Sequence, residues 1–358
     1  MKPRDIHIGD CKMNENSTLL PRISYTNLDI AKFICSLLVI VIHTSPLVDY
    51  PIAQFYSVNV ISRIAVPLFF GTTGFLLFGQ MDYENGKLVN CSKNRTRMFR
   101  YWKKTIFLYL SWAVVYLLLL IPDWYQIGWW GWNAVKDALH AFFIKGMFGH
   151  LWYLISVIWA VPMLYLALRI ISLRNLRMIA VVLWFLGSMN TTYGWLWDEQ
   201  ITLLTIILEI IPVLVTATSC ALPLMVFGAS LAVERNSYKK TGCLFKCLLL
   251  LGLWFLEASA IYFFVPNATH FSSLLVTPFF VYYTLDFLIS ERQIPIPTRM
   301  QCILRETNTV IYCLHPLFIH LFKKFGMSSG ILLWLFTTVI TVGLASMWAF
   351  YKNRKNGR

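Results

Sequence analysis

The sequence predicts an all-α membrane protein, a polytopic helical bundle of about ten transmembrane helices with cytoplasmic N- and C-termini. Three observations lead to this prediction. Of the 358 residues, 58% are hydrophobic and 13% are charged, whereas a soluble domain carries about 25% charged residues. Apolar runs of membrane-spanning length recur along the chain. Lys and Arg gather in alternate connections between these runs.

Ten apolar runs are long enough to cross the bilayer as helices, which takes roughly 17–25 residues each. They occupy residues 27–48, 60–80, 104–122, 151–171, 177–196, 212–233, 244–265, 270–290, 308–325 and 329–351. Because the apolar stretch 201–233 is too long for one helix, we interpret its first part, ITLLTIILEII, as an interfacial or re-entrant segment.

The basic residues orient the bundle. With the N-terminus inside, 25 of the 31 Lys and Arg residues fall in cytoplasmic segments and 4 fall in outer loops, as the positive-inside rule requires. Topology thus accounts for the net charge of +14, which in a soluble protein would suggest nucleic-acid binding. We expect membrane lipids, and no nucleic acid, as partners. The predicted organisation is a cytoplasmic tail at 1–24, a membrane domain at 25–352 and a cytoplasmic tail at 353–358.

None of the eight cysteines falls in a predicted outer loop, and none has the spacing to a histidine that metal sites show. We therefore expect neither a disulfide framework nor a metal site. The longest outer loop, 123–150, contains four tryptophans and an amphipathic stretch, AVKDALHAFF. It predicts a helix lying on the outer leaflet, with the tryptophans as interfacial anchors; stacking on a sugar is the alternative.

The first span contains the most informative polar residues. Asp29, Lys32 and His43 stand in an otherwise apolar segment, where charged side chains are costly and usually face a cavity or the bundle interior. Eleven helical residues advance about 16 Å and return to within roughly 20° of the same face, so Lys32 and His43 share a face at opposite depths. Asp29 lies one turn from Lys32 and can pair with it. Snorkelling of Lys32 and an interhelical hydrogen bond of His43 are the structural alternatives.

Five fragments occur in an order that is typical of one family. They are Lys32 to His43 with a ten-residue spacer, RIAVPLFFGTTGFLLFG, FRYWKKTIFLYLSW, GHLWYLISVIWAVPML and VIYCLHPLFI. With the number of spans, they make the chain similar to the acyltransferase-three family of membrane-bound bacterial acyltransferases, over about 25–350. The resemblance implies a multi-pass protein of the bacterial cytoplasmic (inner) membrane.

The resemblance also implies an O-acetyltransferase. It would move an acyl group, usually acetyl, from cytoplasmic acetyl-CoA as co-substrate to a hydroxyl of a cell-surface or lipid-linked glycan, without a permanently bound cofactor. His43 suits the role of general base, because imidazole titrates near neutral pH. The phosphates of CoA call for cations, and the candidates on the inner side are Lys32, Arg95, Arg97, Arg100, Lys103 and Lys104.

Further candidates are less specific. His315, next to Pro316 in YCLHPLF, is a second catalytic candidate. Its candidate roles are to orient His43, to hold the acceptor or to form a hydrogen bond with a neighbouring helix. Glu209 and Glu257 are acidic residues at membrane depth that orient a histidine or bind nothing. The residues that we assign to substrate contact are Asp29, Arg63, His150, Trp152 and Tyr153.

The chain departs from the family pattern in three places, one of which is a cytoplasmic double-Arg pattern that is spread out here over Arg95, Arg97, Arg100, Lys103 and Lys104. Lys32 stands where the family often has Arg, which keeps the charge but loses the planar fork for phosphate. Thr73-Gly74 stands where Ser-Gly is common. We expect the membrane bundle to perform acyl transfer alone, without an attached extracytoplasmic domain. The alternatives are a transporter of a small polar substrate such as an amino acid, like the membrane domains of vancomycin-resistance serine racemases, and a membrane subunit without turnover.

Overall fold

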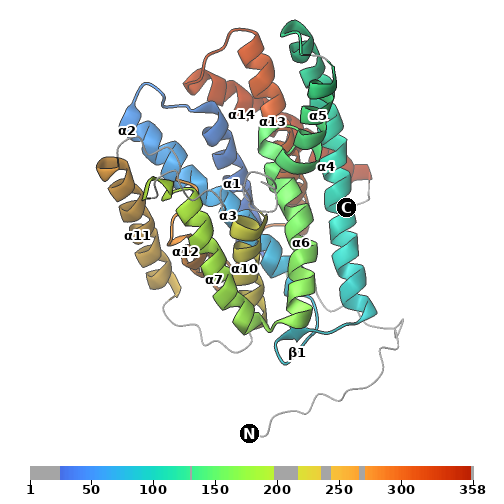
Figure 1. Ribbon diagram of the computed structural model, residues 1–358, viewed down its shortest axis with the longest axis vertical. Coiled ribbons are helices and arrows are strands. Elements are labelled where there is room, and N and C mark those ends of the chain that lie inside the picture. Colours follow the sequence, from blue (N-terminus) through green and yellow to red (C-terminus); the bar gives the residue numbers. More distant parts are fainter. Residues whose placement is uncertain (1–24, 130, 197–216, 235–242, 266–270, 356–358) are drawn as a thin grey trace, which may run out of the picture.

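The computed structural model describes residues 25–129, 131–196, 217–234, 243–265 and 271–355 (Figure 1). They form a helical bundle in which α1, α3 and α10 lie centrally, α11 lies at one edge, and α4 and α5 lie at the other. The principal helices are α1 (Thr26–Thr44), α3 (Ala65–Thr73), α4 (Ser92–Gln126), α5 (Trp132–His140), α6 (Trp152–Ile170), α7 (Leu173–Asn190), α10 (Leu222–Glu234), α11 (Cys243–Phe264), α12 (Thr277–Ser290), α13 (Thr298–Lys324) and α14 (Ile331–Lys355).

Shorter helical segments complete or connect these helices. They are α2 (Pro51–Gln54), η1 (Phe55–Ile61), η2 (Ser62–Ile64), η3 (Gly74–Phe78), η4 (Ala141–Lys145), η5 (Gly149–Leu151), η6 (Gly194–Leu196) and η7 (Ala217–Ala221). The segments from α2 to η3 run on without a break, so that Pro51–Phe78 forms one long span with local changes of pitch.

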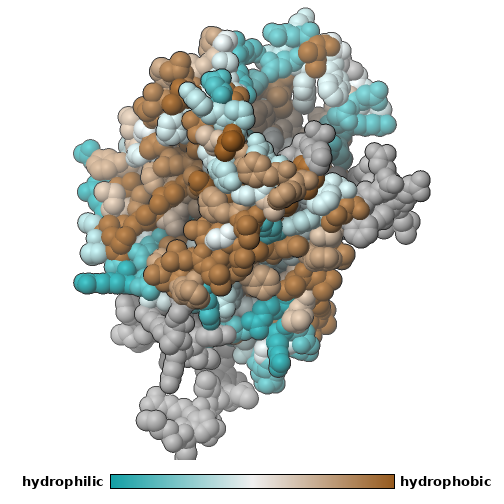
Figure 2. Space-filling model, turned by 90° about the vertical axis from the view of Figure 1, so that its left-hand side faces the viewer, coloured by the Kyte–Doolittle hydropathy of each residue, from teal (hydrophilic) through white to brown (hydrophobic). Residues whose placement is uncertain are grey.

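The prediction of a polytopic helical membrane protein is confirmed. Among the described residues, 7 helices are long and apolar enough to cross a membrane. The other three predicted spans correspond to helices α7, α12 and α13. These helices are not long and apolar enough by the same measure, because α7 and α13 carry charged residues and α12 has 14 residues. Figure 2 shows hydrophobic residues dominating the middle of one face, as contact with lipid tails requires. The interfacial segment predicted within 201–216 lies outside the described residues.

Both ends of the described chain lie at the same end of the bundle. Near the start of α1, Asp29 binds Arg305 of α13. The adjacent Glu306 of α13 pairs with Lys352 near the end of α14 at 2.6 Å. The two termini therefore approach from one side, in accord with the predicted topology, and the positive-inside rule identifies that side as cytoplasmic.

A two-stranded hairpin at this end was not predicted. Strands β1 (Tyr83–Glu84) and β2 (Lys87–Leu88) pair antiparallel around Asn85-Gly86. Both turn residues have positive φ, at 50° and 76°, the backbone form that favours Asn-Gly in two-residue hairpins. Asn94 in the first turn of α4 donates to the carbonyls of Asp82 and Val89. The hairpin therefore fixes the start of α4, from which the basic residues project.

Glycines bring α3 and α10 into close contact at the centre of the bundle. A Cβ on Gly74 would lie 2.0 Å from the carbonyl oxygen of Met225, and a Cβ on Gly228 would lie 1.9 Å from that of Gly71. Small residues at such crossings allow two membrane helices to pack backbone to backbone. Gly74 in the fragment GTTG thus serves helix packing, whereas its neighbour Thr73 lines the cavity described next.

Candidate functional site

A cavity of about 590 Å³ enters the bundle from the end where α1 begins. Helices α1, α3, α4, α6 and α13 and segment η3 form its walls. The lining residues are Lys32, Phe69, Thr72, Thr73, Leu76, Leu77, Gln80, Arg97, Arg100, Tyr101, Lys104, Leu108, Tyr153, Leu154, Arg305, Asn308, Thr309 and Tyr312. Five of these residues are cations, and none of the described lining residues is acidic. A pocket of this size and charge suits a small ligand that carries several phosphates.

Helical periodicity decides which of the predicted cations reach the cavity. Arg97, Arg100 and Lys104 lie three and four residues apart and share one face of α4 with other lining residues. Arg95 and Lys103 are exposed and do not line the cavity. The structure therefore brings together four of the six predicted phosphate-binding residues, with Lys32 of α1 as the fourth.

Arg305 is a cavity residue that the sequence analysis missed. Its Nε and Nη2 atoms lie 2.8 and 2.7 Å from Oδ2 of the buried Asp29, and Lys32 Nζ lies 3.8 Å from Oδ1 of the same carboxylate. Asp29 itself does not line the cavity. Its carboxylate instead positions the two cations Lys32 and Arg305. Arg305 supplies the planar guanidinium that Lys32 lacks. In the sequence it was one more basic residue at the inner end of a span.

Two tyrosines lie at the inner end of the cavity. Tyr153 of α6 and Tyr312 of α13 both line it, and their ring centroids are 5.6 Å apart. The Tyr312 hydroxyl donates to the backbone carbonyl of His150, and the two rings are 5.4 Å apart. The predicted contact residue Trp152 does not line the cavity and packs against Phe70 instead.

Three histidines form a row beyond this end, which we call the histidine row. The ring centroids of His43 and His315 are 5.4 Å apart, and those of His315 and His150 are 5.7 Å apart. His43 is exposed near the outer end of α1, whereas His315 and His150 are buried. All three histidines were predicted as site residues, but the contacts between them were not predicted. Contacts thus lead from the cavity through Tyr312, His150 and His315 to His43.

The hydrogen bonds of the row leave ring nitrogens available. His315 Nδ1 lies 2.9 Å from the carbonyl oxygen of Ile311, one turn earlier in α13. A proton on Nδ1 satisfies that carbonyl and leaves Nε2 as an acceptor. His315 Nε2 and both ring nitrogens of His150 have no hydrogen-bond partner within the described part of the chain. Buried nitrogens of this kind are costly in a purely structural site.

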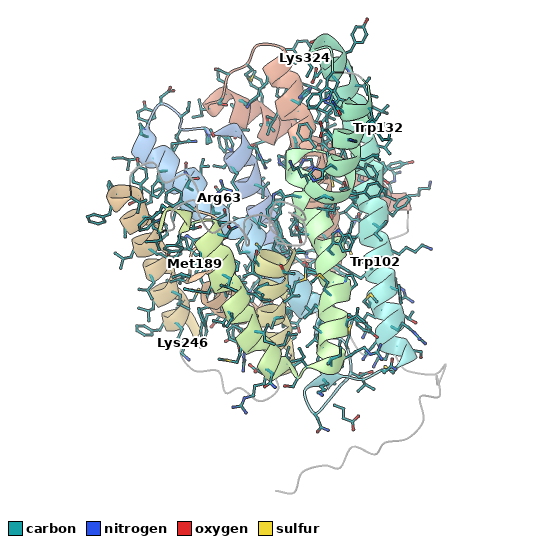
Figure 3. All side chains as sticks on the ribbon, in the orientation of Figure 1. Arg63, Trp102, Trp132, Met189, Lys246 and Lys324 are labelled. Atoms are coloured by element: carbon teal, nitrogen blue, oxygen red, sulfur yellow. The ribbon has the colours of Figure 1, made fainter. Side chains whose placement is uncertain are left out.

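The charged groups that act on His43 are two cations, Arg63 of η2 and Lys323 of α13. Arg63 lies within the bundle in Figure 3, and its Nε atom is buried without a partner among the described residues. Beyond the row, at the outer end, Asp123 of α4 accepts from Lys324 at 2.7 Å and lies 3.1 Å from His320. The outer side of the row therefore carries positive charge.

Among the described residues, Glu257 contacts backbone nitrogens and a tyrosine, not a histidine. Its carboxylate accepts from the backbone nitrogens of Leu275 and Val276, at 2.5 and 3.2 Å, and from the hydroxyl of Tyr193. It thereby holds the two residues that precede α12, which is a structural role. Glu209 lies outside the described residues. In the part of the chain that the structure describes, no three His, Cys, Asp or Glu side chains are grouped to hold a metal ion.

The predicted outer loop contains helix α5, where an amphipathic helix was expected. In α5 and η4, Trp132, Val135, Leu139 and Phe143 are exposed on one side. Behind them a second cavity of about 380 Å³ is lined by Leu120, Trp124, Trp129, Ala134, Asp137, His140, Ala141, Lys145 and Met147. The exposed apolar stripe fits an interfacial helix, and the two lining tryptophans are available for stacking.

Comparison with known proteins identifies the protein family. Residues 25–352 match the acyltransferase domain of the acyltransferase-3 family, and the chain belongs to this family. Its curated relatives include an amino-acid racemase of Enterococcus faecalis, which is 28% identical over 48% of this chain and 22% of that protein. A serine/alanine racemase of Enterococcus gallinarum is 23% identical over 91% of this chain and 46% of its own length. The chain thus spans less than half of either relative. No solved structure matches it significantly.

Proposed function

We propose that this protein is an O-acyltransferase of the bacterial cytoplasmic membrane. It would transfer an acyl group, acetyl as the first choice, from cytoplasmic acyl-CoA to a hydroxyl of a cell-surface or lipid-linked glycan. One observation carries the proposal: a cavity with five cations at its cytoplasmic end abuts, at its inner end, a row of histidines that reaches the outer side.

The two substrates would approach from opposite ends. The phosphates of CoA would bind Arg97, Arg100, Lys104 and the Lys32–Arg305 pair, which places the thioester toward Tyr153 and Tyr312. The acceptor would enter beside His43, where cations flank the approach. Reaction requires the thioester to pass the two tyrosine rings and meet the hydroxyl close to His43.

The chemistry is a single displacement on the thioester. The acceptor oxygen forms a bond to the carbonyl carbon, the carbon–sulfur bond breaks, and CoA leaves as a thiol. His43 takes the hydroxyl proton as the oxygen attacks and passes a proton to the departing sulfur. His315, in ring contact with His43 and held through Nδ1, orients the base. General base catalysis contributes about 10²–10⁴-fold to such reactions.

The test is thioester turnover by the full-length protein in nanodiscs. Acetyl-CoA is supplied with a panel of glycan and lipid-linked acceptors, and released CoA is followed over time. We expect acceptor-dependent release by the wild type and a loss of at least about 100-fold in His43→Ala. His140→Ala, which alters a histidine of α5 outside the row, is the matched control and should retain activity. Full turnover by His43→Ala would refute the assignment of the base.

Transport of an amino acid is the second candidate. The resemblance to the membrane domains of serine racemases suggests it, and 91% of this chain matches a protein named serine/alanine racemase. The assay is uptake of labelled serine and alanine into proteoliposomes, with sealed empty vesicles as the control. Uptake by the wild type without CoA release from any acceptor would favour transport over acyl transfer. CoA release without uptake would favour the acyltransferase.

A further inference from the structure

Asn308 is a buried polar residue in the cavity wall that lacks partners. Its side chain is 7% exposed, and both the amide oxygen and the amide nitrogen are buried without a hydrogen-bond partner in the described part of the protein. The hydroxyl of Thr72 in α3 is in the same condition, on a residue that is 3% exposed. Both residues line the cavity. Leaving such buried groups without a hydrogen-bond partner is costly.

Asn308 occupies a middle zone of the cavity, between two chemically different ends. The lining face of α13 presents Arg305, then Asn308, and then Tyr312. At 1.5 Å per residue, these three positions span about 10 Å along the helix axis. On this face Arg305 lies at one end, Tyr312 beside the histidine row lies at the other, and the neutral amide of Asn308 lies between them.

A ligand group that satisfies Asn308 must both donate and accept, because the side-chain amide offers a carbonyl and an NH₂ group. A phosphate or carboxylate supplies acceptors alone, and an alkyl chain supplies neither. A secondary amide supplies one donor and one acceptor in a fixed geometry. The middle zone of the cavity therefore fits an amide-containing arm between a phosphorylated end and a reactive end.

We propose that Asn308, together with Thr72, recognises the amide groups of a pantetheine arm. This inference rests on the proposed acyl-CoA donor and adds the residue that distinguishes a pantetheine thioester from other phosphorylated ligands. Asn308 is thus a specificity-determining residue of the donor site. Arg305 and the other cations hold the nucleotide phosphates, and α13 aligns both parts of the donor with the histidine row.

The test compares two ligands that differ in the arm. Coenzyme A and adenosine 3′-phosphate 5′-diphosphate, which has the same phosphates but no pantetheine, are titrated calorimetrically into the full-length protein in nanodiscs. In Asn308→Leu, which keeps a similar shape without polar atoms, we expect CoA affinity to fall about tenfold and the affinity for the nucleotide without the arm to change less than about twofold. Asn308→Ser retains one hydroxyl and should lose less.

Asn175→Leu is the matched control. Asn175 is exposed on α7 and does not line the cavity, so both affinities should stay near the wild-type values. Unchanged CoA affinity in Asn308→Leu, or an equal loss for both ligands, would overturn the role of Asn308 while the acyl-CoA donor stands. Absence of CoA binding by the wild type would instead overturn the proposed donor, and with it this inference.

Discussion

Replacing Arg305 with Gln removes the guanidinium that links α13 to α1 at the rim of the cavity. In the wild type, two nitrogens of Arg305 lie 2.8 and 2.7 Å from the same oxygen of Asp29. The substitution leaves that buried carboxylate with Lys32 at 3.8 Å as its remaining ion-pair partner there among the described residues. Lys32 is then drawn toward Asp29, and the cavity has two fewer positive groups that can face phosphate.

The expected magnitude follows from these contacts. A hydrogen bond to a charged group contributes about 1.5–3 kcal/mol, and the Arg305 side chain is 42% exposed. Solvent screening therefore favours the lower end of that range, which corresponds to roughly tenfold weaker binding of CoA. Because Asp29 stays buried, a smaller loss of thermal stability should accompany the loss of affinity.

The assay is titration of CoA at two salt concentrations, with Arg95→Gln as the control. Arg95 is a cytoplasmic arginine that is exposed and does not line the cavity. The affinity of Arg305→Gln should fall and should depend less on salt than that of the wild type. Adding Lys32→Arg to Arg305→Gln should recover part of the affinity, because it returns a planar fork next to Asp29. Wild-type affinity in Arg305→Gln would refute this account of the rim.

Three further predictions follow from the fold. Arg100→Gln should weaken CoA binding several-fold whereas Lys103→Gln should not, because only the former lines the cavity; equal effects in titrations would contradict the helical-face argument. Gly74→Ala should lower the unfolding temperature sharply, since its Cβ meets the Met225 carbonyl, whereas Gly252→Ala, which meets nothing within 4 Å, should be neutral or slightly stabilising. Glu257→Gln should lower thermal stability by about 1 kcal/mol while keeping turnover, because a neutral amide accepts more weakly from the two backbone nitrogens that precede α12; lost turnover with intact stability would assign Glu257 to the site.

The cations of the cavity show which parts of the site could be predicted from the sequence and which could not. The run of basic residues before the third predicted span indicated a phosphate site, but the run alone did not distinguish its five predicted cations. The helix separates them, because residues three and four apart share a face and their neighbours do not. That selection was accessible from the sequence. Arg305 was not, because it comes from a helix that is 276 residues from Asp29 along the chain.

The Asn-Gly hairpin and the glycine contacts are intermediate cases. Asn85-Gly86 is the local signal for a two-residue turn, but the surrounding apolar spans obscured it. The glycines in GTTGFLLFG were visible as small residues within a span. That Gly74 faces Met225 on α10 depends on how two distant helices cross, and no pattern within one helix specifies its partner.

The sequence by itself determined that the protein is a polytopic helical membrane protein, because apolar runs need lipid and the bilayer sets their length. Its motifs also predicted the acyltransferase-3 family, which the match over residues 25–352 confirms. Only the tertiary structure decided that His43, His315 and His150 form one row and that Arg305 and Asn308 belong to the cavity. The physical reason is that periodicity specifies the face of a helix, whereas packing between helices specifies what that face meets.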